Sequence, residues 1–108
     1  MNYNYFIEVN HTTGKMMAKL LPKKEMIDFL NEKYSNIGAA DASDFYGREA
    51  NGIWLRGTES QIINGHRVYD EDMFFKEGGV NPELEALLKE HGWYGEPYDS
   101  GTLFAWEA

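Results

Sequence analysis

Alternation of apolar and polar residues predicts strands in three parts of the chain. Residues 3–9 (YNYFIEV) alternate and are rich in aromatic and β-branched side chains. Residues 15–21 (KMMAKLL) follow a turn segment and predict the second strand of a hairpin. The strand pattern returns at residues 52–57 (GIWLRG). Two further extended segments are predicted near the end of the chain, at residues 93–98 (WYGEPY) and 102–107 (TLFAWE).

The dipeptide Asn64-Gly65 lies between two short apolar runs and predicts a tight hairpin. Both residues tolerate the positive φ angles that a two-residue hairpin turn of this kind requires. The two strands of this hairpin are expected at about residues 59–63 and 66–69.

A period of 3.6 residues predicts two helices. The first spans about 22–34, with Pro22 at its first helical position. The second spans about 82–91, with Asn81 as its N-cap and Gly92 just past its end. The apolar face of the first helix is formed by Met26, Ile27, Leu30 and Tyr34.

Residues 35–51 (SNIGAADASDFYGREAN) show weak apolar periodicity, and we interpret them as a long irregular loop with one short helical turn. Hairpin signals outnumber segments that could cross over between parallel strands. The chain is therefore predicted to fold as one α+β domain over residues 1–108. Its sheet is expected to be mostly antiparallel, with about five to six strands and two α-helices.

Charge changes this picture most, because 18 acidic residues against 10 basic ones give a net charge of −8. Such a chain repels phosphate groups, so direct binding to nucleic acid or to an anionic membrane surface is not expected. The first residues lack the basic and apolar regions of a secretory signal. The chain also has no cysteine. Together these features predict a cytoplasmic protein.

Motifs of catalysis and cofactor binding are weak in this sequence. Residues 99–102 read DSGT, as in aspartic proteases. Only a few residues follow them, however, and the segment before them is not an apolar strand, so we interpret Asp99 as a turn residue and expect positive φ at Gly101. The histidines are widely spaced, and no glycine-rich phosphate loop is present. No catalytic residue, metal site or cofactor is predicted, and a non-enzymatic role is favoured.

The last 16 residues contain five aromatic side chains, three acidic ones and no basic one. Tyrosine and tryptophan are common anchors of protein interfaces, and acidic neighbours attract a basic partner. This composition predicts a partner-binding surface made of Trp93, Tyr94, Glu96, Tyr98, Asp99, Trp106 and Glu107.

Short, acidic, aromatic-rich chains without cysteine are typical of small phage accessory proteins and bacterial immunity proteins. The leading hypothesis is therefore a non-enzymatic inhibitor or modulator of a basic, nucleic-acid-handling protein, of the anti-CRISPR, anti-restriction or immunity type. The alternative is a small-ligand-binding or enzymatic α+β domain with a cleft near Trp54, His66 and Tyr69. The chain is expected to be a monomer or a homodimer, and a homodimer could pair edge strands at 3–9 or 102–107.

Overall fold

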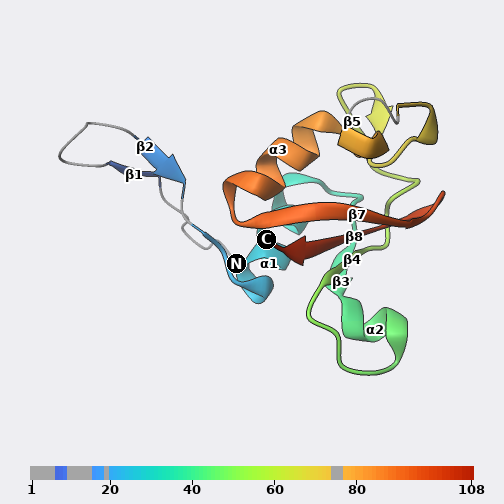
Figure 1. Ribbon diagram of the computed structural model, residues 1–108, viewed down its shortest axis with the longest axis horizontal. Helices are drawn as coiled ribbons and strands as arrows, with labels where there is room; N and C mark the ends of the chain where they lie inside the picture. The colour runs from blue at the N-terminus through green and yellow to red at the C-terminus, as the bar shows by residue number, and fades with distance from the viewer. Residues whose placement is uncertain (1–6, 10–15, 19, 74–76) are drawn as a thin grey trace.

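The computed structural model of the protein describes residues 7–9, 16–18, 20–73 and 77–108 (Figure 1). Two short 3-10 helices accompany the strands and α-helices. In chain order the elements are β1 (Ile7–Val9), β2 (Met16–Ala18), α1 (Lys23–Lys33), β3 (Ala39–Asp41), α2 (Ala42–Tyr46), β4 (Ile53–Leu55), β5 (Ile62–Ile63), β6 (His66–Arg67), η1 (Glu71–Met73), η2 (Glu77–Gly79), α3 (Pro82–Glu90), β7 (Trp93–Asp99) and β8 (Thr102–Glu107).

The main sheet is antiparallel and has the strand order β3-β4-β8-β7. Strands β1 and β2 pair only with each other, and so do β5 and β6. The predicted α+β fold with antiparallel strands is confirmed. The described strands form one four-stranded sheet and two separate hairpins, whereas one sheet of about five to six strands was predicted from the sequence.

The hydrophobic core lies between helices α1 and α3 and one face of the sheet, called here the inner face. Alternation along the strands sends every second side chain to this face. Figure 1 shows α3 and α2 on opposite sides of the strands, and helix α1 packs beside β3. The buried side chains of this core include Met26, Phe29, Leu30, Ile53, Leu55, Leu84, Leu88, Trp93, Leu103 and Ala105.

Both predicted long helices are confirmed, with small differences at their ends. Pro22 is the N-cap of α1 and has extended backbone angles, so the helix begins one residue later than expected. At α3, the Asn81 side chain accepts a hydrogen bond from the backbone N–H of Glu83. Gly92 follows this helix with φ +90°. The polar N-cap and the left-handed glycine therefore delimit α3 as the sequence predicts.

The predicted hairpin at Asn64-Gly65 is also confirmed. The φ angles are +52° at Asn64 and +78° at Gly65, and the flanking strands β5 and β6 pair Ile63 with His66. Each strand is only two residues long, which is shorter than the apolar pattern predicted.

The interpretation of residues 35–51 as an irregular loop is wrong in its first half. Residues 39–41 form β3, which pairs with β4, and α2 follows at once. The Asp41 side chain caps α2 by accepting a hydrogen bond from the Ser43 N–H at 2.9 Å. The short helical turn expected in this segment is thus present as α2. A strand of three residues carries too little alternation to be recognised in the sequence.

Each outer edge of the main sheet is held by a side chain from a helix. On β3, the Asn31 amide accepts a hydrogen bond from the Ala39 N–H at 2.8 Å and donates one to the Ala39 carbonyl at 3.0 Å. On β7, the buried Glu85 carboxylate accepts from the Gly95 N–H at 2.8 Å, and Pro97 has no N–H to offer. Residues 102–107 were proposed as an edge strand, but they form β8 in the interior of the sheet.

Candidate protein-binding surface

The face of the sheet opposite the inner core, called here the outer face, is unusually aromatic. Trp54 on β4 lies opposite Phe104 on β8, and Trp106 on β8 lies opposite Tyr94 on β7. Their neighbours Ile53, Leu103 and Ala105 belong to the inner core. Aromatic side chains therefore occupy the outer phase of the two central strands and of β7.

Phe45 of α2 is the centre of an aromatic cluster on this face. Its ring centroid lies 5.1 Å from those of Tyr46, Trp54, Tyr98 and Phe104. All four contacts are edge-on, a favoured geometry for aromatic pairs. Trp106 extends the cluster through Phe104, at 5.7 Å. The short helix α2 thus packs on the sheet through Phe45 and also through Tyr46, whose ring stacks on Phe104 at 5.5 Å. Phe45 in addition contacts the ring of Tyr98.

Trp106 also packs on the sheet through a glycine. A Cβ atom placed on Gly52 would lie 2.5 Å from two carbons of the Trp106 ring. Such a contact is far shorter than carbon atoms tolerate. The indole can pack against the backbone here only because residue 52 has no side chain. Gly52 therefore sets the position of the ring at the edge of the aromatic cluster.

Six of the seven predicted partner-binding residues lie on the surface of the β7–β8 hairpin. Tyr94 and Tyr98 are 38% and 56% exposed, and Trp106 is half-buried beside them. The carboxylates along the hairpin are exposed as well. We call this set the hairpin surface: Tyr94, Glu96, Tyr98, Asp99, Trp106 and Glu107.

Trp93, the seventh predicted residue, was wrongly assigned to this surface. It is 1% exposed and belongs to the inner core, and its indole Nε1 donates a hydrogen bond to the Leu21 carbonyl at 2.8 Å. The cause is strand alternation, which directs Trp93 and Tyr94 to opposite faces of β7.

The DSGT sequence forms the turn of this hairpin. Asp99 accepts a hydrogen bond from the Gly101 N–H at 3.0 Å, and Asp99 pairs with Thr102 across the strands. The expected turn role of Asp99 is confirmed. The expected positive φ at Gly101 is wrong, because Gly101 is absent from the described left-handed residues. A Cβ at this position would lie 3.1 Å from the carboxyl carbon of Glu59, an exposed side chain that can rotate away.

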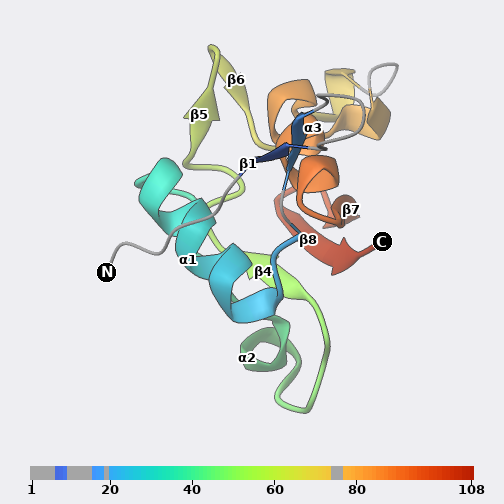
Figure 2. The same cartoon turned by 90° about the vertical axis from the view of Figure 1, so that its left-hand side faces the viewer.

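The three residues of the alternative cleft lie in separate environments. Trp54 belongs to the aromatic cluster on the outer face. His66 is exposed on the β5–β6 hairpin, whereas Tyr69 is buried and forms a β-bridge with Val80. Figures 1 and 2 both show that hairpin extending away from β4. The structure therefore does not bring these three described side chains together around one ligand.

Lys23 and Asp41 connect helix α1 to the aromatic side of the sheet. The Lys23 Nζ lies 2.8 Å from Asp41 Oδ2. The hydrogen bond from Lys23, followed by those from Ser43, lowers the pKa of the Asp41 carboxyl from 3.8 to about 2. The charged form of Asp41 is thus stabilised in the folded protein.

Asp41→Asn is expected to lose a pH-dependent part of the stability. Because the pKa of Asp41 is lowered on folding, its contribution is complete above about pH 4 and is lost as pH falls through about 2. Asparagine is also a good N-cap, so the change isolates the charge. The unfolding free energies of wild type and variant should differ by about 0.2–1 kcal/mol at pH 6 and converge below about pH 2. Asp44→Asn, on the same helix, is the control, and a constant difference at all pH values would contradict the assignment.

Residues from other elements also neighbour the hairpin surface, and they were not predicted from the sequence. A pocket beside Trp106 is lined by Lys23, Asn51, Tyr94, Trp106 and Glu107. Lys23 and Asn51 come from segments far from the hairpin in the sequence. The glycine that follows Asn51 was the only local signal, because it marks a close approach of another group.

Comparison of the chain with models of known protein families, with characterised proteins and with solved structures found no match. Within the described ranges, no group of three or more His, Asp or Glu side chains is arranged as a metal site. In the same part of the chain, no helix has the length and apolar character needed to cross a membrane. The chemistry of the hairpin surface therefore carries the functional argument.

Proposed function

We propose that this protein is a non-enzymatic, cytoplasmic binding protein that inhibits or modulates a basic, nucleic-acid-handling partner, in the manner of anti-CRISPR, anti-restriction or immunity proteins. One observation carries the proposal. The hairpin surface presents two exposed tyrosines and three exposed carboxylates, and residues 93–108 contain no basic side chain.

The two kinds of side chain have complementary roles in this proposal. Tyr94 and Tyr98 provide apolar contact area at a low cost in side-chain entropy, and their hydroxyl groups can remain hydrated. The three carboxylates pair with lysine and arginine side chains of the partner that would otherwise bind phosphate groups. They belong to Glu96, Asp99 and Glu107. Binding is therefore expected to weaken as salt concentration rises.

The support beneath this surface favours tight binding. Tyr98 contacts both Phe45 and Phe104 of the aromatic cluster, and Asp99 is fixed in the turn by Gly101. Side chains that already have their bound positions lose less entropy when a partner docks. The hairpin surface thus has the restraint expected of a recognition surface.

The proposal is tested by capture from a bacterial lysate with two matched variants. Tyr94→Ala/Glu96→Lys removes an exposed ring and reverses one charge on the hairpin surface. Ile62→Ala/Glu32→Lys makes the same kind of change elsewhere, because Ile62 is 53% exposed and Glu32 is exposed on α1. Thermal unfolding first checks that both variants fold.

We expect wild type and the control to retain the same nucleic-acid-handling protein at about 0.05 M salt and to release it at about 0.5 M. The hairpin variant should retain at least about tenfold less, since central aromatic anchors dominate interface energies. Equal capture by both variants, or no stoichiometric partner, would contradict the proposal.

A further inference from the structure

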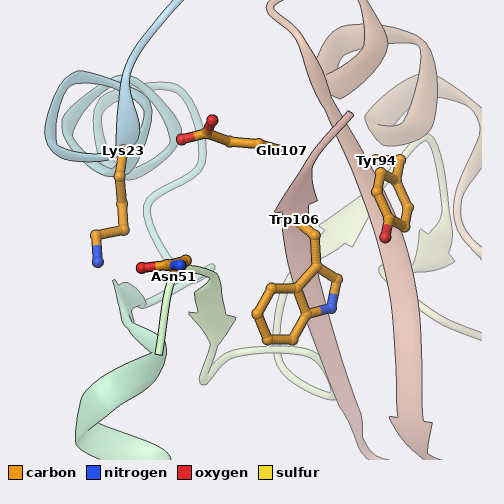
Figure 3. Close-up of a pocket in the computed structure, with 5 residues that line it drawn as sticks. All are labelled: Lys23, Asn51, Tyr94, Trp106 and Glu107. Carbon is orange, nitrogen blue, oxygen red and sulfur yellow. The ribbon is translucent and has the colours of Figure 1, made fainter. Parts of the chain in front are cut away.

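A pocket of about 470 Å³ lies at the β8 end of the hairpin surface (Figure 3). Lys23 of α1 and Asn51, just before β4, lie on one side of Trp106, and Tyr94 lies on the other. Glu107 points from the end of β8 toward α1. Pockets of this size hold small ligands or single side chains of a partner.

The pocket is negatively charged once its internal ion pair is considered. The Lys23 ammonium is paired with Asp41 at 2.8 Å and also donates to the Ala50 carbonyl at 3.4 Å. Glu107 is exposed and has no ion-pair partner among the described residues. Lys23, Asp41 and Glu107 together carry one negative charge, so a cation entering the pocket would restore neutrality.

The other walls are aromatic. Trp106 and Tyr94 are cross-strand neighbours. The Trp106 ring packs directly against Gly52, which fixes the position of the ring. An aromatic face attracts a cation through its quadrupole, most strongly when the ring is tryptophan. A carboxylate beside such rings is the usual complement of a guanidinium group.

We propose that this pocket receives an arginine side chain of the basic partner, an inference that rests on the proposed function. The planar guanidinium can lie against the Trp106 indole while its N–H groups donate to the Glu107 carboxylate. Asn51 supplies an amide oxygen as a second acceptor. Arginine fits better than lysine, because it stacks on aromatic rings and is less strongly hydrated than an ammonium group.

The indole groups provide a direct readout. Trp106 Nε1 is buried and has no hydrogen-bond acceptor among the described residues, whereas Trp93 Nε1 is bonded to Leu21 deep in the core. In an NMR spectrum of ¹⁵N-labelled protein, the Trp106 signal should therefore report occupancy, and the Trp93 signal should remain in place. Trp106→Phe and Trp93→Phe assign the two signals.

The experiment titrates the full-length labelled protein with N-acetyl-arginine amide at constant ionic strength. N-acetyl-citrulline amide, which has the same shape without the charge, is the neutral control, and N-acetyl-lysine amide tests the selectivity. We expect a saturable shift of the Trp106 indole with the arginine compound in the millimolar range. The citrulline and lysine compounds should bind at least about fivefold more weakly.

Glu107→Gln should weaken arginine binding by about tenfold, since hydrogen bonds to a charged group are the stronger kind. Glu32→Gln, an exposed carboxylate on α1, should leave it unchanged. Equal shifts with citrulline or lysine, or an unchanged affinity in Glu107→Gln, would overturn the arginine assignment. If the hairpin variant still loses its partner in the capture experiment, the proposed function stands and only this inference fails. If the arginine compound binds as expected but the hairpin variant keeps its partner, the arginine assignment stands and the proposed function fails.

Discussion

Gly57→Ala is expected to lower the free energy of unfolding by about 3 kcal/mol or more, at the upper end of overpacking effects. A Cβ atom on Gly57 would lie 1.8 Å from the Asn36 carbonyl oxygen and 2.9 Å from two backbone carbons. No side chain can rotate away to relieve this clash, because the obstacle is backbone. The Gly57 N–H also donates to the Ile37 carbonyl at 2.8 Å, so the two segments cannot separate without losing that bond.

Gly47→Ala is the matched control for this change. Gly47 has φ +70°, and nothing lies within 4 Å of a Cβ placed there. Alanine should therefore cost only the conformational strain of a left-handed residue, about 1–2 kcal/mol. Urea unfolding of both variants measures the difference. Equal losses would show that the segment at Asn36 can move aside and that the close approach at Gly57 is not required.

Trp93→Ala is expected to cost about 3–5 kcal/mol, as for other large aromatic residues removed from a core. The side chain is 1% exposed, and it connects β7 to the segment before α1 through its bond to Leu21. Trp93→Phe keeps most of the apolar contact and loses that hydrogen bond. It should cost less than the alanine variant, although the Leu21 carbonyl is left without its donor.

Thermal and urea unfolding of the two Trp93 variants check this prediction. If Trp93→Ala were nearly neutral, Trp93 could not be a core residue, and its original assignment to the hairpin surface would return. If Trp93→Phe were as unstable as Trp93→Ala, most of the stabilisation by Trp93 would come from its hydrogen bond to Leu21.

Local signals were enough to predict the helices and the tight hairpins. The N-cap Asn81, the left-handed Gly92 and the Asn64-Gly65 turn act on their own neighbours, so the sequence around each one contains the information. Strand β3 was missed because its three residues show too little alternation and its pairing partner β4 comes from a later segment of the chain. Its Ala39 is held by Asn31, from a helix that the local pattern does not place beside it.

The composition of the hairpin surface could be predicted from the sequence, but not which of its side chains point to solvent and which to the core. The sequence shows that aromatic and acidic residues gather at the end of the chain, yet Trp93 and Tyr94 look equivalent in it. The core decides between them, since the helix that buries Trp93 approaches one face of β7 only. The pocket at Trp106 depends on Lys23 and Asn51, and no sequence spacing relates these residues to the hairpin.

The two side chains that hold the sheet edges restrict how a partner can be recognised. An extended peptide binds many proteins by joining a sheet as one more strand, using free backbone groups at its border. In the main sheet, Asn31 occupies both outward groups of Ala39, Glu85 occupies the N–H of Gly95, and Pro97 has no N–H to offer. We therefore expect a partner of this sheet to be recognised by the side chains on the outer face of the sheet. Its recognition should depend on the partner's folded surface and not on a linear segment.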